Sequence, residues 1–533
     1  MRATYFGAGI AARAARACLL LAVAACVLST LRIFPGGVAE PAGAGPPAPK
    51  RAATLVVAVP ADPVRLDPHD ASDSPSTMVN FHIYDRLVEL GDDMEPVPSL
   101  AVSWSSNEAG DVWRLRLRPG VRFHDGSVLS ADVVKRNFDR LLDPALGLAR
   151  RGIVSGFVKE VAVVDDLTVE IRLLSPVAPF LKILAHDALG IVAPAAMDAA
   201  GGAFRPIGTG PFRLASWSPG ARLVLEAFEG HWRGKPPFDR IEFLIVPAGS
   251  SRAIMLETGQ ADAAFPVEPA HAAKLARNPE VDVEQVKTQR IVYLAFNLAR
   301  RPWDDSRVRR AVSQAIDREK LARFLLFGFA SPAFLPLAEG TWGYAGVPAL
   351  PYDPAASRSA LRALVGPGER RKVALWSPSG RYPQERAVAQ GIAAALSEAG
   401  LEVEIRLFEW GAYLDLLRRK EGWDLAVLGW TPATGDADMA LRPLFLSGAP
   451  GNHGGYASAE VDRLIERAVR TLDPAARRTV YEELLALLAF EMPVLPLYSP
   501  HVAYGRRSEV QGIKLSSTET VDFRFAWREG VGL

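Results

Sequence analysis

Apolar residues alternate with arginines along residues 112–117, and this period of two predicts a strand with one buried face. Pro119-Gly120 predicts a turn, after which Val121 and Phe123 resume the alternation as the second arm of a hairpin. Ser130 is placed to cap the helix that follows. The apolar stripe of that helix consists of Val133, Val134, Phe138 and Leu141.

Further along the chain, the predicted helices and strands alternate. Residues 384–398 predict a helix that ends at Gly400, which suits the C-terminal end of a helix. Residues 401–407 alternate as a strand, and residues 424–428 form a second strand that ends before Gly429. This strand–helix–strand order predicts a mainly parallel α/β sheet.

The totals describe an ordinary globular chain. With 533 residues it is too long for one core and predicts two or three domains. The residues are 49% apolar and 23% charged, and the formal net charge of +1 argues against a broad nucleic-acid surface. Both cysteines, Cys18 and Cys26, lie near the N-terminus, which excludes disulfides and cysteine-ligated metals from the rest of the chain.

The N-terminal segment carries an export signal. Three arginines precede the twelve-residue apolar run Ala17–Leu28, which has the length of a signal-peptide core and is short for a membrane span. Residues 35–49 are rich in Pro, Gly and Ala and predict a flexible tether. The residues that lead to Cys26 resemble the lipobox of bacterial lipoproteins, in which this cysteine is lipidated. Cleavage near Ala39 and an uncleaved anchor over Ala17–Phe34 are the alternatives.

Motifs of catalysis are missing from the sequence. The eight histidines form no H-E-x-x-H, and the chain has no G-x-S-x-G. Gly208 and Gly210 could suggest a phosphate loop, but a strand pattern follows them where a phosphate loop requires a helix. The sequence therefore gives no reason to predict an enzyme, and no cofactor or metal is expected.

Several motifs together resemble the peptide/nickel-type solute-binding proteins of bacterial ABC importers, solute-binding protein family 5. The family pattern P-S-L-A-x-S-W stands at residues 98–104, and L-R-x-G-V-x-F-H-D-G stands at residues 117–126. Gly-Thr-Gly-Pro-Phe follows at residues 208–212, and V-R-x-A and A-I-D-R follow within residues 308–318. The resemblance covers about residues 54–533.

This resemblance implies a periplasmic-binding-protein type II fold, in which two α/β lobes surround a ligand cleft, are joined by a hinge and carry an extra domain. Residues 1–53 are then the signal and tether. The implied domain limits are 54–92, 204–288 and 498–533 for domain I, 93–203 for domain II, and 289–497 for domain III.

Two loops are candidates for lining the cleft. The loop at residues 376–383 follows a strand, and ligands of open α/β sheets collect at the carboxyl ends of strands. In dipeptide-type members an arginine at this loop position clamps the peptide carboxylate, and Arg381, beside Tyr382, aligns with it. A planar guanidinium suits this task because it offers two parallel donors.

The second loop spans residues 429–445 and presents Trp430, Thr431 and Thr434. Family dipeptide binders carry an aspartate here that pairs with the peptide amine, but this chain has Ala433 at that position. The remaining pattern is similar to glutathione-importer binding proteins. Two aspartates, Asp436 and Asp438, either accept the amine from a shifted position or cap the next helix, and the cap is favoured for Asp438.

The polar loop at residues 70–76 completes the candidate contacts with Asp73, because the resemblance places this loop at the cleft. The resulting hypothesis is a monomeric, non-enzymatic receptor outside the cytoplasmic membrane. It captures a short peptide or peptide-like solute of the dipeptide, oligopeptide or glutathione class and delivers it to an ABC permease by hinge closure. A nickel-chelate or haem carrier of the same family, a sensory or regulatory domain, and a hydrolase are the rivals.

The lipid anchor can be tested directly. We expect the native chain to incorporate labelled fatty acid and the Cys26→Ser variant to incorporate none, because the cysteine thiol is the acceptor. Metabolic labelling followed by N-terminal sequencing of the membrane fraction measures this. A full-length N-terminus on soluble cytosolic protein would contradict both the lipoprotein and the cleaved signal peptide.

Overall fold

The structure is a computed structural model that describes residues 54–197, 204–365, 371–379 and 381–529. The predicted signal segment, the tether and Cys26 lie outside these residues. The largest sheet has twelve strands in the order β16-β15-β17-β13-β18-β11-β1-β10-β9-β8, with β12 and β14 also paired to β18. Its strands are β1 (Thr54–Val59), β8 (Phe212–Ser218), β9 (Arg222–Ala227), β10 (Arg240–Ile245), β11 (Ala263–Val267), β12 (Val281–Lys287), β13 (Ile291–Phe296), β14 (Ala330–Pro332), β15 (Lys372–Ser379), β16 (Glu402–Glu409), β17 (Leu425–Trp430) and β18 (Val494–Arg507).

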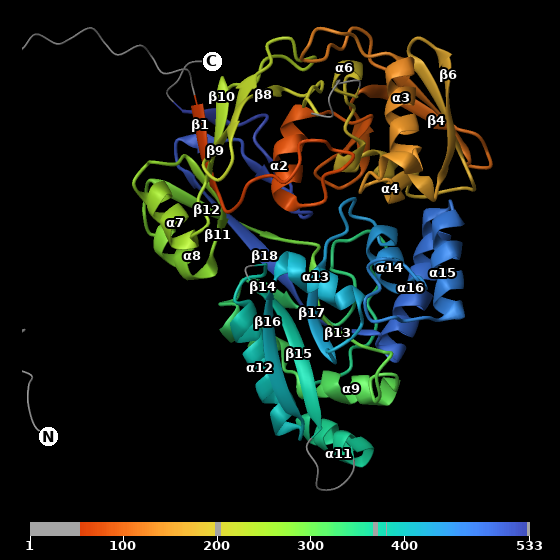
Figure 1. Ribbon diagram of the computed structural model, residues 1–533, viewed down its shortest axis with the longest axis vertical. Coiled ribbons are helices and arrows are strands. Elements are labelled where there is room, and N and C mark those ends of the chain that lie inside the picture. Colours follow the sequence, from red (N-terminus) through yellow and green to blue (C-terminus); the bar gives the residue numbers. More distant parts are fainter. Residues whose placement is uncertain (1–53, 198–203, 366–370, 380, 530–533) are drawn as a thin grey trace, which may run out of the picture. The chain divides into compact units, whose positions relative to one another are not determined.

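Strand β18 runs through both halves of this sheet, as Figure 1 shows. Its first residues pair with β13 and β14, and its last residues pair with β11 and β12. Where the two halves join, β18 is tied to the segment between β12 and β13 by side chains as well as by backbone. The Thr288 hydroxyl donates to the Pro500 carbonyl at 2.8 Å, and the Ser499 hydroxyl donates to the Thr288 carbonyl at 2.7 Å.

The expectation of a mainly parallel sheet is correct for part of it. Strand β15 pairs in parallel with β16 and β17, and β1 pairs in parallel with β10 and β11. The other pairs are antiparallel, so the prediction is wrong for the sheet as a whole. One reason is that the chain passes between the two halves once in each direction and the two passages pair with each other. In addition, β8, β9 and β10 follow one another as antiparallel neighbours, and β13 runs antiparallel to β17.

Helices cover both faces of β13, which is buried along its whole length. Alternate residues of β13 therefore enter two different cores, as expected for a strand in the middle of an α/β layer. One core is covered by α9 (Ser306–Ala315), α11 (Pro354–Val365) and α12 (Glu385–Glu398). The other is covered by α13 (Trp410–Arg418), α14 (Asp438–Phe445), α15 (Ala459–Arg470) and α16 (Pro474–Glu491). Helix α12 is followed by Gly400 at a φ of 104°, as the sequence predicts.

The other half of the large sheet has its own two cores. Helix α2 (Ser74–Ile83) packs with β1 and β8–β10 in one of them. Helices α7 (Gly249–Glu257) and α8 (Pro269–Leu275) lie side by side against β11 and β12 in the other (Figure 1). The remaining short elements of this half are β19 (Val510–Gln511), β20 (Lys514–Leu515), β21 (Val521–Asp522) and β22 (Trp527–Arg528).

A separate four-stranded sheet has the order β4-β5-β7-β6, with α3 packed on it. The Ser130 hydroxyl oxygen accepts the Val133 N–H at 3.4 Å, so the predicted cap of α3 is confirmed. The predicted second hairpin arm at residues 121–123 is wrong, because both edges of β5 are already occupied by β4 and β7 and residue 122 makes only an isolated bridge. The elements of this region are β2 (Val88–Leu90), β3 (Pro96–Pro98), β4 (Ala101–Ser106), β5 (Val112–Leu117), α3 (Ala131–Leu142), α4 (Gly152–Ser155), β6 (Val158–Asp165), β7 (Thr168–Leu173), α5 (Phe180–Leu184) and α6 (Pro194–Met197).

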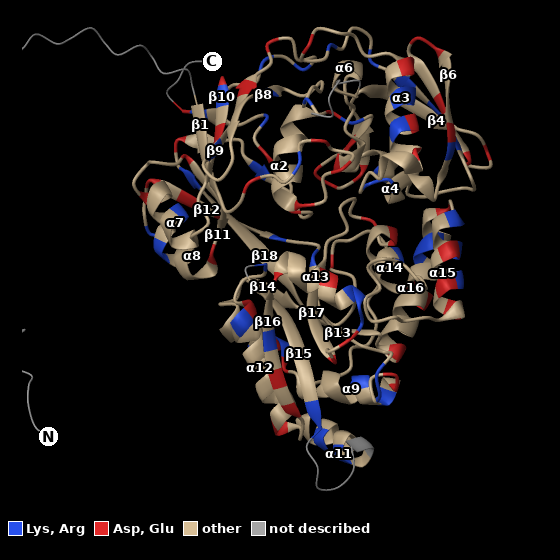
Figure 2. Cartoon of the chain, viewed as in Figure 1, with Lys and Arg blue, Asp and Glu red and all other residues tan. Residues whose placement is uncertain are grey.

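Charges of both signs are interleaved on the surface helices, as Figure 2 shows for α3 and α15. On α15 the interleaved charges pair with one another, for example Arg463 with Glu460. Within the described part of the chain, no helix is long and apolar enough to cross a membrane.

The Gly-x-Gly motif has a packing role. Gly210 lies against the end of α2 and donates its N–H to the Ile83 carbonyl at 2.9 Å. A Cβ at Gly210 would lie 2.6 Å from the His82 carbonyl oxygen, and one at Gly208 would overlap the Ile83 carbonyl. Between them, the Thr209 hydroxyl donates to the buried Asp85 carboxylate at 3.0 Å. The motif is therefore a close contact between two stretches of backbone, and β8 follows it as predicted.

We expect Gly210→Ala to lower the free energy of unfolding by about 1–3 kcal/mol, because the added methyl group meets backbone atoms that cannot rotate away. Urea unfolding measures the loss. Gly346→Ala is the matched control, since a Cβ there meets nothing within 4 Å. Equal stability of the two variants would contradict the close-contact explanation.

Candidate functional site

Two loops meet at the carboxyl ends of β15 and β17. The strands are parallel neighbours, so their ends lie at the same edge of the sheet. The Tyr382 hydroxyl lies 3.1 Å from the position that a Cβ would take at Gly429. The guanidinium carbon of Arg381 lies 5.4 Å from the ring centroid of Tyr382 and 5.3 Å from that of Trp410. The structure thus brings the predicted Arg381 and Tyr382 together with the end of β17, where Trp430 lies.

Arg290, which no sequence motif indicates, also lies at this edge. Its neighbour Ile291 pairs with Trp430, which places Arg290 level with the loop after β17. Its guanidinium donates to both carboxylate oxygens of Glu519, at 2.7 and 2.6 Å, and its carbon lies 6.0 Å from the Tyr382 ring centroid. No local pattern indicates this pair, because 229 positions separate its members.

Glu519 reaches Arg290 from a strained backbone. Its φ is 69°, in the left-handed region that costs a non-glycine residue roughly 1 kcal/mol. The turn around it is held by Ser516, whose carbonyl accepts the Glu519 N–H at 3.0 Å and whose hydroxyl oxygen accepts the Thr520 N–H at 3.0 Å. The two charge-assisted hydrogen bonds to Arg290 offset the backbone cost.

Arg290 and Arg381 differ in how far neighbouring charges balance their own. Burial works against the charge of Arg290, but Glu519 outweighs it and raises the pKa of this guanidinium. Burial and then the charge of Arg290 lower the pKa of Arg381. Arg381 forms no ion pair with another described residue, and the Glu385 carboxylate accepts the backbone N–H groups of Arg381 and Tyr382, each at 2.9 Å. Glu519 and Glu385 oppose this lowering only in part, so Arg381 is a largely enclosed cation without an ion pair among the described residues.

A cavity of about 630 Å³ lies next to this edge, a size typical of ligand pockets. The turn that holds Glu519 forms one of its walls, through Ser516–Thr518 and Thr520, and Ala433 contributes the loop after β17. Its other lining residues are Phe81, Arg86, Glu89, Leu90, Gly91, Asp92, Met94, Ala185, Asp187, Arg233, Glu284, Val286, Ile513, Lys514, Leu515, Asp522, Arg524 and Phe525. The predicted contacts Asp73, Arg381, Tyr382, Trp430, Thr431, Thr434, Asp436 and Asp438 are not among the described residues that line it.

The charges in this cavity wall neutralise one another. Arg524 pairs with Glu89 and Asp522, and Arg233 also pairs with Glu89. Burial opposes ionisation of Glu89, but the guanidiniums of Arg524, Arg86 and Arg233 outweigh it and lower its pKa to about 2. Glu89 therefore stays ionised at neutral pH. The wall contributes a fixed ion-pair network, whereas Arg381 at the neighbouring sheet edge has no ion pair among the described residues.

Asp436 and Asp438 are paired inside the protein. Asp436 is 1% exposed and receives two hydrogen bonds from Arg477, at 2.9 and 2.6 Å. Asp438 is equally buried and pairs with Arg442 at 3.1 Å; burial raises the pKa of its carboxyl, and Arg442 partly opposes this rise. In this structure both carboxylates are taken up by arginines and are not presented to a ligand amine.

The favoured helix cap at Asp438 is wrong. Helix α14 begins at Asp438 itself, and Asp436 accepts the Asp438 N–H at 3.0 Å, so the capping carboxylate belongs to the other aspartate. Asp73 also has a structural partner. Its carboxylate accepts the N–H and the hydroxyl of Ser76, at 2.9 and 2.7 Å, and so caps α2. A ligand contact for Asp73 stays a prediction.

The polar side chains of the loop after β17 differ in their hydrogen bonding. The Trp430 indole N–H donates to the Met439 carbonyl at 2.8 Å and holds the loop against α14. The hydroxyls of Thr431 and Thr434 are buried and have no hydrogen-bond partner among the described residues. Neither threonine is among the described residues that line the cavity.

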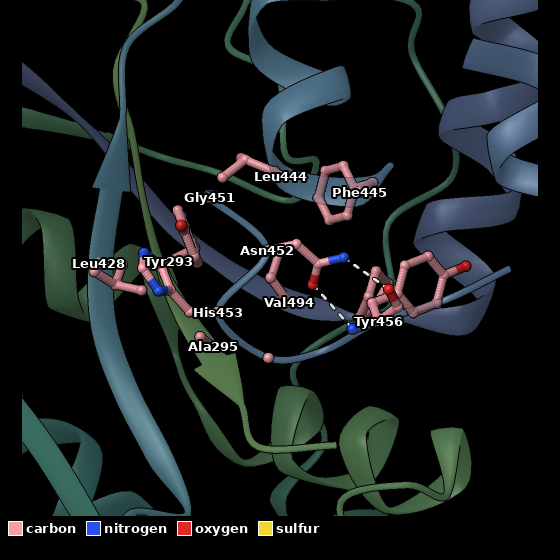
Figure 3. A pocket seen from close by; sticks show the side chains of 12 residues that line it. Tyr293, Ala295, Leu428, Leu444, Phe445, Gly451, Asn452, His453, Tyr456 and Val494 are labelled. Atoms are coloured by element: carbon pink, nitrogen blue, oxygen red, sulfur yellow. Dashed lines mark hydrogen bonds between the residues drawn. The ribbon is translucent and has the colours of Figure 1, made fainter. Parts of the chain in front are cut away.

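A second, much smaller void lies between β13, β17 and α14 (Figure 3). Its volume of about 10 Å³ holds at most one water molecule. Asn452 closes one side with hydrogen bonds to the backbone of Tyr456, at 2.7 and 2.9 Å. The void is too small for a peptide. Among the described residues, no cluster of histidines, cysteines and carboxylates is arranged to hold a metal ion.

Comparisons with known proteins place these observations in a family. Residues 95–452 match the family described as bacterial extracellular solute-binding proteins, family 5 Middle. The chain is 32% identical over 454 residues to the glutathione-binding protein GsiB of Escherichia coli K12, covering 83% of this chain and 88% of that protein. The glutathione-binding protein GsiB of Salmonella typhi is 33% identical with the same coverage.

Solved structures agree with the fold. The periplasmic binding protein DppA of Helicobacter pylori, in complex with the peptide STSA, has a TM-score of 0.80 and 27% identity and covers 89% of this chain and 98% of its own. A dipeptide-binding protein of Pseudoalteromonas sp. SM9913, in complex with Met-Leu, has a TM-score of 0.81 at 23% identity, with coverages of 89% and 100%. The predicted fold class is confirmed.

The buried pair of Asp436 and Arg477 should contribute to the stability of the fold. We expect Asp436→Ala to lower the free energy of unfolding by about 3–5 kcal/mol, because it leaves the buried Arg477 charge unpaired. Glu460→Ala, which removes the surface partner of Arg463, should cost no more than about 1 kcal/mol. Urea unfolding of the two variants measures the difference. An Asp436→Ala variant of native stability would contradict the structural role.

Proposed function

Because the chain belongs to the bacterial extracellular solute-binding proteins, family 5, we propose that it is the substrate-binding protein of an ABC importer. Its substrate is a short peptide or peptide-like solute of the dipeptide, oligopeptide or glutathione class. The relatives named as glutathione-binding and the solved complexes with short peptides support this class. The receptor acts outside the cytoplasmic membrane, is tethered through the segment before residue 54, and delivers its ligand to a permease.

The observation that carries this proposal is Arg381. It is an arginine without an ion pair in the described chain, beside two aromatic rings that contact each other at the carboxyl edge of a parallel strand pair. Burial disfavours its charge, and Arg290 disfavours it further. A ligand carboxylate relieves both costs at once and offers two acceptors to the planar guanidinium. Arg381 therefore reads the carboxylate of the ligand.

The other end of the ligand is recognised differently from a plain dipeptide. Ala433 stands at the cavity where dipeptide binders have an amine-binding aspartate, and the neighbouring Asp436 and Asp438 are paired with arginines. The amine is therefore read less stringently than the carboxylate. Contacts from both halves of the large sheet favour a closed state when ligand is bound, and hinge closure presents that state to the permease.

We expect Arg381→Ala to weaken binding by roughly 30-fold or more, since truncating one partner of a buried charge pair costs about 2–5 kcal/mol. Calorimetry with glutathione, simple dipeptides and their C-terminally amidated forms measures this. Arg386→Ala is the matched control, because Arg386 is exposed on α12 five positions later, and its binding constants should equal those of the native chain.

The carboxylate clamp predicts that the native protein discriminates strongly against amidated ligands. Equal binding of free-acid and amidated forms by the native chain would rule out this role of Arg381. Loss of binding in both Arg381→Ala and Arg386→Ala would instead indicate damage to α12.

A further inference from the structure

Asp187 is the carboxylate of the cavity wall that the ion-pair network leaves most open. It lines the cavity, and its side chain is 21% exposed. Its single ion pair with a described residue is with Arg86, whose Nη1 lies 3.5 Å from Oδ1. A charge-assisted hydrogen bond is normally about 2.7–2.9 Å long, so this contact is weak. The other carboxylate oxygen, Oδ2, accepts no hydrogen bond from the described part of the chain.

The other four carboxylates that line the cavity are held more closely. Each of them has an ion-pair partner at 3.1 Å or closer. These pairs are Glu89 with Arg233 and Arg524, Asp522 with Arg524, Asp92 with Lys514, and Glu284 with Arg506. The cavity wall therefore offers one carboxylate that is both accessible and loosely paired.

The electrostatic balance of Asp187 is opposite to that of Glu89. Burial raises the pKa of Asp187, and the charges of Arg86, Arg150 and Arg524 oppose this rise only in part. In the same wall, arginines outweigh burial and lower the pKa of Glu89 to about 2. The protein thus compensates the charge of Glu89 fully and leaves that of Asp187 in need of a further cation.

The partner of Asp187 is also engaged with an aromatic ring. The guanidinium carbon of Arg86 lies 4.5 Å from the ring centroid of Phe81, which lines the cavity as well. Arg86 therefore divides its interactions between this ring and Asp187, and the carboxylate receives one long contact. The backbone that presents the carboxylate is held in place, because the Asp187 carbonyl accepts the Gly190 N–H at 3.2 Å.

Asp187 and Ala433 belong to different walls of the same cavity. Asp187 follows α5, and its neighbours Ala185 and Leu189 pack in the core of the four-stranded sheet. Ala433 belongs to the loop after β17 in the large sheet. A ligand in the cavity can therefore meet a carboxylate on the wall of the four-stranded sheet, although the loop after β17 offers none.

We propose that Asp187 binds the ammonium group of the ligand and takes over the role of the aspartate that is absent at Ala433. This inference rests on the proposed function and deepens it, because it specifies peptides with a free amine. Oδ2 accepts an ammonium N–H and gains the opposite charge that the wall does not supply. Arg86 keeps part of the carboxylate, so the preference for an ammonium is smaller than an unshared aspartate would give.

The test compares Ala-Ala with N-acetyl-Ala-Ala, and glutathione with N-acetyl-glutathione, by calorimetry. We expect the native chain to prefer the free amine by about fivefold to tenfold, because an acylated nitrogen carries no charge. In Asp187→Asn, which is nearly isosteric, the preference should fall to within about twofold. Asp92→Asn is the matched control. It removes the same charge from the same cavity wall, but from a side chain that is 87% exposed, and should keep the native preference.

The outcomes separate this contact from the carboxylate clamp. A native chain that binds free-amine and N-acetyl forms equally, while it still rejects C-terminally amidated ligands, would overturn the role of Asp187 and leave the proposed function intact. An unchanged preference in Asp187→Asn would overturn that role too, as would an equal loss of preference in Asp92→Asn, which would indicate a general effect of charge. A native chain that binds none of the four ligands would overturn this contact together with the peptide class itself.

Discussion

The structure depends on the hydrogen bonding of β18. This strand of 14 residues pairs with β13 and β14 along its first half and with β11 and β12 along its second half, which satisfies much of its backbone hydrogen bonding. This continuous pairing joins the two halves of the large sheet. It also determines where β13 begins, and hence that Gln289 and Arg290 lie at the sheet edge beside the ends of β15 and β17.

Charge is distributed unequally around that edge. The cavity wall contains a closed network in which Glu89, Arg233, Asp522 and Arg524 compensate one another. Across the turn at residues 516–520, the Arg290 charge is matched by Glu519, whereas that of Arg381 has no partner in the described chain. A receptor for an anionic group needs this imbalance, because a fully compensated site would exchange one ion pair for another with little net gain.

Local patterns predicted local structure well. The strand at residues 112–117, the Ser130 cap and the helix that ends before Gly400 were correct because period, caps and glycines act within a few residues. The direction of strand pairing was predicted only for β15–β17, since β13 and β18 meet after some 200 residues of chain. The same limit applies to the site. Arg477 pairs with Asp436 across 41 positions of sequence, and Glu519 pairs with Arg290 across 229 positions. No local sequence pattern predicts either pair.

The hydrogen bonds that join Thr288 to Ser499 and Pro500 have a mechanical consequence. The two passages between the halves of the sheet are fastened to each other by hydrogen bonds of 2.7 and 2.8 Å, so neither can bend or twist alone. Two independent connections would let the halves of the sheet bend, twist and slide relative to each other. Two connections that are hydrogen-bonded to each other instead favour rotation of the halves about a single axis. Few relative orientations are then accessible before ligand arrives, and little orientational entropy is lost when a ligand holds the halves together.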